Sequence, residues 1–450
     1  MEAGPPALRD VILENFMDRQ LMDFIDRADG AAGRHMNFVD PGPLPEKLTM
    51  VPGFVSELAD WTMRYGHSPN RTLAFTGALA MLAHLAGRSY ADESGARTNL
   101  YIIALGVSGI GKDDPRKTNK RLAERLDWSQ SMIESVASGE ALEDAVAAHP
   151  SLFFQPDEVA GLFGQMRGQG KVAKSLSGMV RRLFSSSDSE YVPRKKASDG
   201  RRDAGLPRAQ PIRCPHLTIF GTGVPEEMLD ALTPQEIRNG LFGRCLVLNV
   251  PDDNVRQTGS AFEALPQNVL RVGAMLVDRE SRTQESGVIG MQVVPSSDEA
   301  KAAKRWAMEA FGRQRRLLQE ADLMNAHAIV SRIDEKIGKL ALVYAISENP
   351  YEPKITRAAV EWAVAFVVHV VRWMLYEAQF HVSEGKFGKL MERAKSIMSR
   401  NNGVIDRRSL IQKLHCDVAT FTRLIRTLLV AEEIEPPAEI DGKLVYQLVK

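Results

Sequence analysis

The stretch Leu100-Tyr-Ile-Ile-Ala-Leu-Gly106-Val-Ser-Gly109-Ile-Gly111-Lys112 decides how the rest of this chain is interpreted. Its apolar, β-prone first half predicts a strand. The glycines of residues 106–112, the glycine loop, let the backbone turn tightly and present amide N–H groups to phosphate oxygens. A helix that follows would direct its positive end at the same anion, and Lys112 would reach the β- and γ-phosphates. The stretch therefore predicts a phosphate-binding loop, with a structural turn as the alternative.

The residue after Lys112 departs from the GxxxxGK-[ST] pattern. Ser or Thr normally stands there as a magnesium ligand, whereas this chain has Asp113. A carboxylate is a hard oxygen ligand for Mg²⁺, but its charge opposes phosphate binding when no metal is present. Asp113 thus predicts either an altered metal site or weakened catalysis. We expect ATP and Mg²⁺ as cofactors, with nucleotide contacts from Gly106, Ser108, Gly109, Ile110, Gly111, Lys112 and Asp113.

A second apolar run, Ser151-Leu-Phe-Phe-Gln-Pro-Asp157-Glu158, ends in two carboxylates. Its place after the glycine loop is that of a Walker B strand. In this interpretation Asp157 holds Mg²⁺ through water, and Glu158 orients and deprotonates the attacking water. Pro156 makes the strand end irregular, because proline donates no hydrogen bond to the ladder. The alternative is an acidic loop without a catalytic role.

Two more residues at strand junctions are candidates. The run 216–223 predicts a strand whose Thr222 contacts the γ-phosphate or the attacking water. Arg244 stands just before another apolar run, where an arginine finger acting across a subunit interface could stand. A plain loop residue and a surface arginine are the respective alternatives. Arg332 could be a second phosphate sensor, but a salt bridge with Glu335, on the same helix face, is the favoured interpretation.

Alternating patterns over residues 98–250 predict an α/β core with a largely parallel sheet, and we place this core at residues 98–295. Its expected strands are 100–105, 151–155, 216–221 and 245–250, with 288–294 as a further candidate. Residues 1–50 predict an arm with one helix (7–27) and a linker, and residues 51–97 predict two helices, the second closed by Gly87. Residues 296–385 predict a helical subdomain with helices at 298–320, 325–347 and 356–379.

A polar interruption at residues 166–213 predicts that part of this segment is a mobile basic loop. Ring helicases hold DNA with such loops through phosphate contacts, which are insensitive to sequence and weaken with salt. Tyr191 could stack on a base. A solvated loop without a ligand is the alternative. The expected nucleic-acid contacts in this segment are Arg181, Arg182, Arg194, Lys195 and Lys196.

Residues 386–450 predict a small winged-helix domain: helices at 386–400, 407–414 and 417–431, then a hairpin turning at residues 441–442. The third helix would be the recognition helix and would expose Arg423 and Arg426 to DNA. Many winged helices bind protein instead, and the acidic tail from Glu432 to Glu439 opposes a close phosphate approach. The residues expected to face the core of this domain are Val418, Phe421, Leu424, Ile425 and Leu428.

Composition limits the class of protein. The 57 Lys and Arg residues equal the 57 Asp and Glu residues, so only local charge clusters can indicate a partner. The three cysteines show no CxxC spacing, which argues against a zinc site or a disulfide framework and fits a reducing cytoplasm. The start lacks the pattern of a secretory signal. Residues 358–375 are apolar but carry charged interruptions, which predicts a buried helix instead of a membrane span.

Together these motifs resemble a phage and prophage family of P-loop proteins of unknown function that are described as helicase-like or primase-associated. The resemblance covers roughly residues 50–380 and implies a RecA-like ATPase core that serves as a replicative helicase of mobile elements. It implies nucleotide roles for Lys112, Asp157, Glu158 and Arg244. The motifs that carry it, in order, are Gly87-Arg88, the glycine loop, Ser138-Gly-Glu-Ala-Leu, the acidic segment 154–162, the strand 215–223, Gly243-Arg244 and the helix containing Arg332.

The sequence therefore predicts a nucleic-acid-dependent ATPase with a RecA-like P-loop core, flanking helices and a C-terminal winged helix. We expect a homo-oligomeric ring, a hexamer, acting as a helicase or translocase on single-stranded or forked DNA in the cytoplasm of a bacterial host. No membrane partner is expected. One alternative is a nucleotide-binding DNA-binding protein with little turnover, such as an origin binder or loader, which Asp113 favours. Another is a phage-defence ATPase.

Overall fold

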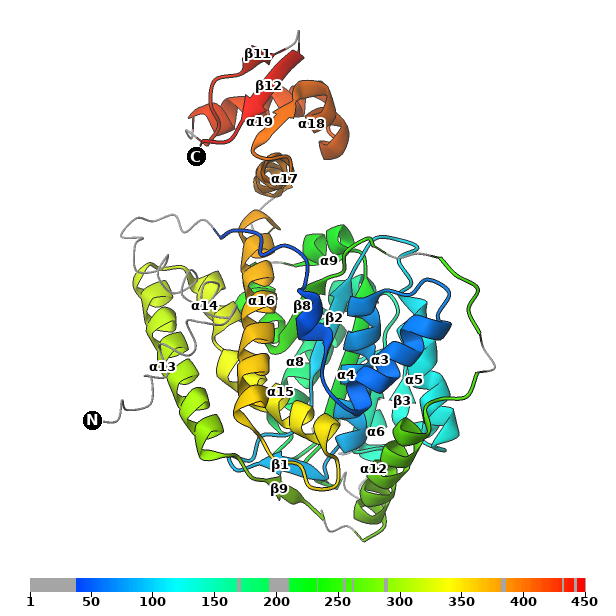
Figure 1. Cartoon of the computed structure of the whole chain (residues 1–450). Coiled ribbons are helices and arrows are strands. Elements are labelled where there is room, and N and C mark those ends of the chain that lie inside the picture. The colour runs from blue at the N-terminus through cyan, green and yellow to red at the C-terminus, as the bar shows by residue number, and fades with distance from the viewer. Residues whose placement is uncertain are drawn as a thin grey trace, which may run out of the picture.

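The main sheet has five parallel strands in the order β3–β4–β7–β2–β8 (Figure 1). Four of them confirm the strands expected from the sequence, and the short edge strand β3 was not expected. The strands are β2 (Tyr101–Leu105), β3 (Met132–Ile133), β4 (Ser151–Phe154), β7 (His216–Gly223) and β8 (Cys245–Asn249). This computed structural model describes residues 38–167, 171–193, 210–232, 234–253, 256–260, 263–286, 290–381, 386–430, 433–440 and 443–449.

Both faces of the sheet are covered, so every residue of β2 and β7 is buried. Along β7, Phe220 points toward Gly77 on one face. On the opposite face, a Cβ added to Gly221 or Gly223 would lie 2.9 Å from a methyl group of Val159. These two glycines therefore let the chain after β4 pack directly on β7.

The helices on the Phe220 face are α3 (Phe54–Tyr65), α4 (Arg71–Ala86), α5 (Asp113–Arg125) and α12 (Gln267–Ser286). Those on the other face are α6 (Gly139–Ala148), α7 (Val159–Arg167), α8 (Lys171–Ser185) and α9 (Pro225–Ala231). The central one, α4, is buried from Thr72 to its end. Asn70 caps its first turn by accepting from the Leu73 N–H, and Gly87 ends it with φ +48°.

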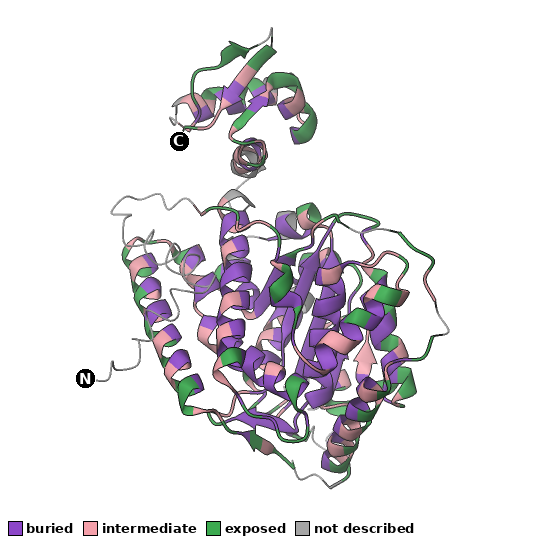
Figure 2. Ribbon diagram, in the orientation of Figure 1, coloured by how far each residue is buried: buried purple, intermediate pink, exposed green. Residues whose placement is uncertain are grey.

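The helices that follow α12 in the sequence cover the side of the sheet next to β8. They are α13 (Asp298–Glu320), α14 (Met324–Val330), α15 (Ile333–Glu348) and α16 (Arg357–His381). Among them α16 packs along β8, and α15 packs on α16 and α4 (Figure 1). One apolar cluster runs from Leu44 to Leu375, so the helical segments before and after the sheet share its core. Figure 2 shows this burial concentrated in the strands, α4 and α16.

Helix α16 is long and apolar enough to span a membrane by length and composition. However, 78% of its apolar window is buried within the fold, and the Trp362 indole donates to the Leu48 carbonyl at 2.9 Å. The prediction of a buried helix is confirmed. His369 and Trp373 of α16 line a small space together with Leu248 and Asn249 at the carboxyl end of β8.

One expectation about local structure is wrong, and two segments contain helices that the sequence had not predicted. The segment 166–213, part of which was expected as a mobile loop, contains α8 over residues 171–185. The segment 256–295, where only a strand at 288–294 was suggested, contains the long helix α12. The single helix expected at 325–347 is two helices, because α14 ends at Val330 and Arg332 is the N-cap of α15. The break at Arg332 is therefore a case in which the tertiary structure overrides a continuous local pattern.

Smaller pairings complete the core. A parallel pair joins β1 (Tyr90–Asp92) to β9 (Gln292–Val294), which falls inside the candidate strand 288–294. An antiparallel pair joins β5 (Glu190–Tyr191) to β6 (Ile212–Arg213). The short helices α10 (Pro234–Arg238) and α11 (Leu241–Arg244) lead into β8.

The C-terminal unit has an apolar cluster of its own, from Ala394 to Tyr446. It consists of α17 (Lys386–Arg400), β10 (Val404–Asp406), α18 (Arg407–Leu414), α19 (Val418–Val430), β11 (Ala438–Ile440) and β12 (Lys443–Gln447). The strands form an antiparallel sheet in the order β10–β12–β11. Helix α17 packs against the end of α16, where the Arg400 guanidinium lies 2.6 Å from Glu377.

Candidate functional site

The glycine loop lies at the carboxyl end of β2, directly before α5. Gly109 and Gly111 have φ values of +84° and +94°, which side chains other than glycine rarely adopt. A Cβ on Gly111 would also lie 1.8 Å from the Ser68 carbonyl oxygen, whereas a Cβ on Gly109 would lie 3.7 Å from its nearest neighbour, Arg256 Nη2. Gly111 is therefore required twice over, by its backbone angle and by the close approach of a neighbouring segment.

The loop is anchored at both ends by hydrogen bonds. The Gly106 N–H donates to the Gly223 carbonyl at 2.9 Å, which joins the loop to β7. At the other end the Asp114 carboxylate accepts from the Ser68 N–H at 2.7 Å. Between these anchors Ser108 and Gly109 are exposed, whereas Ile110 is buried. The Ile110 side chain therefore belongs to the packing of the loop, and only its backbone could contact a ligand.

Lys112 is half-buried and bends back over its own loop. Its Nζ donates to the Gly106 carbonyl at 3.4 Å. If a phosphate entered the loop, the Lys112 ammonium group would have to give up only this weak hydrogen bond to bind it.

An arginine absent from the sequence-based candidates lies at the centre of the charged residues here. Arg116, on α5, places Nη1 2.7 Å from Asp157 Oδ1 and 3.4 Å from Asp113 Oδ1. Its Nη2 lies 3.0 Å from Glu134 Oε1. The two carboxylates predicted to bind metal are thus brought together on one guanidinium nitrogen. The spacing of Arg116 from Asp113, three residues along a helix, was the only local signal of this contact.

The end of β4 is fastened to α5 and β7. Gln155 is buried, accepts from Asn119 at 3.1 Å and donates to the Arg116 carbonyl at 3.2 Å. Thr222 is also buried, and its hydroxyl donates to the Asp157 carbonyl at 3.1 Å. In this arrangement Thr222 positions the acidic segment, and its hydroxyl is directed at protein backbone.

Glu158 is exposed at the start of α7, and Asp157 beside it has a side chain that is 61% exposed. The carboxylates predicted to carry the chemistry thus face solvent at the carboxyl edge of the sheet.

Arg244 lies at the amino ends of the sheet strands, whereas the glycine loop lies at their carboxyl ends. Arg244 directly precedes β8, whose five residues span roughly 16 Å at about 3.3 Å per residue. Because β8 and β2 are parallel, Arg244 cannot reach the glycine loop of its own chain. Its guanidinium donates to the Gly240 carbonyl at 2.8 Å and the Ser185 hydroxyl at 3.2 Å, and it lies over the Phe184 ring.

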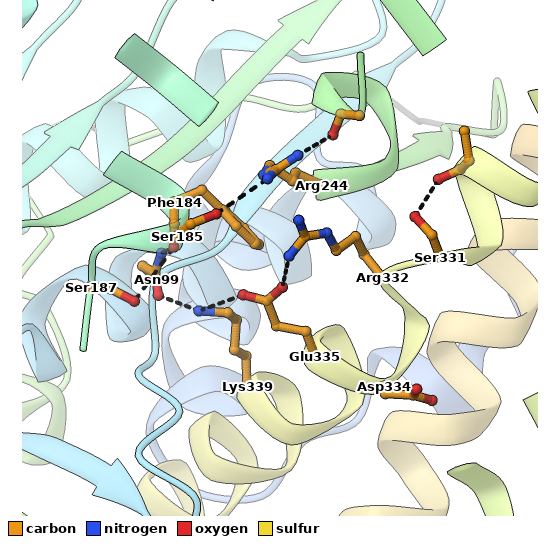
Figure 3. Close-up of polar contacts among 12 residues, drawn as sticks. Asn99, Phe184, Ser185, Ser187, Arg244, Ser331, Arg332, Asp334, Glu335 and Lys339 are labelled. Carbon is orange, nitrogen blue, oxygen red and sulfur yellow. Dashed lines mark hydrogen bonds and ion pairs between the residues drawn. The ribbon is translucent and has the colours of Figure 1, made fainter. Parts of the chain in front are cut away.

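Other cations gather beside Arg244 (Figure 3). Arg332 forms the ion pair predicted from the sequence, with Nη1 3.0 Å from Glu335 Oε2. Lys339 is buried, donates to the Asn99 side-chain oxygen and lies 4.8 Å from the centre of the Phe184 ring. Burial, and then the nearby Arg332 charge, lower the pKa of Arg244. Burial also lowers the pKa of Lys339 to about 8.

In the basic segment predicted to hold nucleic acid, the described side chains named as candidates contact other parts of the protein. Arg181 and Arg182 are half-buried on α8, where Arg181 donates to the Asn239 carbonyl and Arg182 lies over the Tyr191 ring. Tyr191 is itself buried and donates to the Glu143 carboxylate, so it is not placed to stack on a base. Arg194, Lys195 and Lys196 lie outside the described residues, as does the predicted helix 7–27.

The outer face of α19 follows the prediction in part. Arg423 and Arg426 are exposed, and Phe421, Leu424, Ile425 and Leu428 are buried. Val418, expected in the core, is 59% exposed because it is the first residue of the helix and points away from the cluster. A separate groove of about 780 Å³ lies between the start of α18 and β12. Arg407, Arg408 and Lys443 contribute positive charge to its lining, and Asp406 contributes negative charge.

The carboxylates at the carboxyl ends of the strands can hold Mg²⁺ only if a bound ligand supplies further oxygen atoms. Within the part of the chain that the structure describes, no group of three or more His, Cys, Asp or Glu residues could hold a metal ion. Mg²⁺ is usually held by one or two carboxylates together with phosphate oxygens and water. Asp113 and Asp157, which share one Arg116 nitrogen, meet that requirement if a nucleotide supplies phosphate.

No protein-family model and no curated protein sequence matches this chain.

Proposed function

We propose that this protein is a nucleic-acid-dependent ATPase with a RecA-like P-loop core. One observation carries the proposal: the glycine loop, Lys112 and the carboxylates Asp113 and Asp157 converge at the carboxyl edge of a parallel sheet. In open α/β sheets, ligands bind outside the carboxyl ends of strands where the following helices go to opposite faces. Here α5 follows β2 onto one face, whereas α9 follows the neighbouring β7 onto the other.

Each residue at this edge would have a distinct task. The amides of the glycine loop and Lys112 would bind the triphosphate. Asp113 and Asp157 would hold Mg²⁺, which neutralises phosphate charge when bound. Glu158, exposed next to Asp157, would accept a proton from the attacking water. Thr222 would keep Asp157 and Glu158 in position through its bond to the Asp157 carbonyl.

Arg244 would act on a nucleotide bound by a neighbouring subunit. Its position at the amino edge supports this role, because the length of β8 separates it from the loop in its own chain. An arginine finger acting in trans requires an oligomer, and a ring such as a hexamer satisfies this geometry.

The nucleic-acid contacts we propose are to phosphates, through Arg423 and Arg426 on α19 and through the basic groove at Arg407, Arg408 and Lys443. The helix and strand order of the C-terminal unit supports a winged helix. We propose further that the protein acts as a helicase or translocase of a mobile element in the cytoplasm of a bacterial host.

A second candidate is a nucleotide-binding protein with little turnover. The specific observation in its favour is the ion pairing of Arg116 with both proposed metal ligands, which would compete with Mg²⁺.

The deciding experiment measures ATP binding and hydrolysis with and without single-stranded DNA. For the ATPase, we expect DNA to stimulate hydrolysis and Lys112→Ala to abolish it, a loss of at least about a hundredfold. Arg125→Ala is the matched control, because Arg125 is an exposed cation on the last turn of α5, away from the loop. Binding without hydrolysis would favour the second candidate. Hydrolysis as fast in Lys112→Ala as in wild type would contradict the ATPase site at Lys112, and absence of ATP binding by wild type would contradict both candidates.

A further inference from the structure

The Arg116 guanidinium is surrounded by carboxylates that belong to three different segments. Asp113 begins α5, Glu134 follows β3, and Asp157 follows β4. Nη1 contacts Asp157 and Asp113, and Nη2 contacts Glu134, all within 3.4 Å. One cation thus joins the ends of two strands to the helix that follows the glycine loop.

Arg116 is the fixed member of this cluster and the carboxylates are its movable members. The Arg116 side chain is only 10% exposed, whereas those of Asp113 and Asp157 are 60% and 61% exposed. Its backbone carbonyl accepts from the buried Gln155, which ties this turn of α5 to the end of β4. Its Nε is buried and has no hydrogen-bond partner among the described residues. The guanidinium therefore stays in place while the acidic side chains can rotate toward another cation.

We propose that Arg116 is an internal cation that competes with divalent metal for Asp113 and Asp157. This inference rests on the proposed function only in taking those two residues as the metal ligands. The oxygens that face Nη1 are the ones that a metal ion would need. A metal that enters must draw at least one carboxylate away from Arg116 and must do so beside a like charge. In the free protein Arg116 keeps metal affinity low, and the charge of a bound triphosphate restores it.

Metal alone is the first probe, because it needs no nucleotide. Mn²⁺ binding to the full chain is followed by the loss of the free-ion electron paramagnetic resonance signal. We expect Arg116→Gln to bind Mn²⁺ about tenfold more tightly than wild type, since a unit positive charge near the ion is removed. The control is Arg125→Gln, an exposed site on the same helix, for which we expect a change of less than about twofold. Unchanged or weaker Mn²⁺ binding in Arg116→Gln would overturn the proposal.

Nucleotide affinity gives a second readout. A fluorescent ATP analogue is titrated with Mg²⁺ and, separately, with a chelator present. In Arg116→Gln the ratio of the affinity with Mg²⁺ to that without should rise about tenfold, because metal binds more easily and metal-free phosphate meets less positive charge. An equal ratio in variant and wild type would contradict the competition. If wild type binds no nucleotide in either condition, the proposed function fails and the Mn²⁺ titration alone decides the role of Arg116.

Folding of the variants is checked by thermal unfolding. If Arg116→Gln does not fold, Arg116→Lys replaces it in the Mn²⁺ titration. A lysine keeps the charge but cannot present the two nitrogens that hold three carboxylates. We expect Mn²⁺ affinity in Arg116→Lys to rise by at least about twofold, and no rise would count against the proposal.

Discussion

Charged residues at the carboxyl ends of the main-sheet strands (the carboxyl edge) are exposed, whereas those at the amino ends (the amino edge) are buried. At the carboxyl edge, Asp113, Asp157 and Glu158 are exposed around the glycine loop. At the amino edge, Lys336 and Lys339 are buried, and the buried pair of Arg88 and Glu280 lies close by. Solvent-exposed charges can exchange protein partners for a ligand, whereas buried charges are committed to the fold. The comparison shows that strongly perturbed ionisable groups mark the structural edge of this sheet, and exposed paired groups mark the proposed site.

The largest expected effect comes from breaking the buried pair at the amino edge. Arg88 Nε lies 2.7 Å from Glu280 Oε1, and both side chains are almost fully buried. Arg88→Met should destabilise the fold by about 3–5 kcal/mol, because it leaves the buried Glu280 charge without its cation and with only the backbone N–H of residue 88 as a donor. Urea unfolding measures this change. The double variant Arg88→Met with Glu280→Leu should recover most of the loss, and a double variant as unstable as the single one would show that the pair is not the cause.

A smaller effect is expected at the carboxyl edge from Gly111→Ala. The substitution forces alanine to φ near +94° and brings Cβ against the Ser68 carbonyl, so we expect destabilisation of more than about 2 kcal/mol together with loss of nucleotide binding. Gly109→Ala is the matched control. It has a similar positive φ, but its Cβ would meet only Arg256 Nη2 at an ordinary contact distance of 3.7 Å, so only the backbone strain of about 1–2 kcal/mol should remain. Thermal unfolding compares the two, and equal losses of stability would deny the role of the Ser68 contact, while nucleotide titration checks the loss of binding in Gly111→Ala.

The smallest effect is a gain in stability at the amino edge. Burial lowers the pKa of Lys336 to about 8, and its Nζ has no hydrogen-bond partner among the described residues. Below pH 8 both folded and unfolded chains carry this proton, so the folded state bears the full penalty of a buried charge. Lys336→Met should therefore stabilise the protein at pH 7 by ~1–2 kcal/mol.

The same variant has a defined pH dependence. Between pH 8 and the unfolded lysine pKa of about 10.4, the unfolded chain keeps a proton that the folded chain has released, so wild-type stability gains from rising pH. The advantage of Lys336→Met should thus shrink between pH 8 and 10. Burial raises the pKa of the nearby Cys245 thiol to about 12, and loss of the Lys336 charge can only raise it further, so the thiol stays protonated in both folded proteins up to pH 9.5. Urea unfolding at pH 7 and pH 9.5 tests this, and a constant difference would contradict it.

Much of the core could be predicted from the sequence because its patterns are local. Four strands of the main sheet, α4 ending at Gly87, and α13, α17 and α18 all follow from apolar periodicity and turn residues over a few positions. The remaining segments differ in cause. Helix α8 lies in a polar stretch, but Leu176, Val180 and Leu183 recur on one buried face at helical spacing, so the signal for this helix is local as well. The break at Arg332 interrupts a pattern typical of one continuous helix, and there the tertiary structure overrode local preference.

For the candidate site, the sequence by itself determined which residues stand near strand ends: the glycine loop with its positive-φ glycines, and the acidic pair at residues 157–158. Only the tertiary structure decided what those residues face. The order of the strands placed Asp157 beside Asp113 on one Arg116 nitrogen, turned Thr222 toward backbone, buried Tyr191, and set Arg244 at the far edge of the sheet. The physical reason is that strand order and helix side are fixed by long-range packing, which no short window of sequence contains.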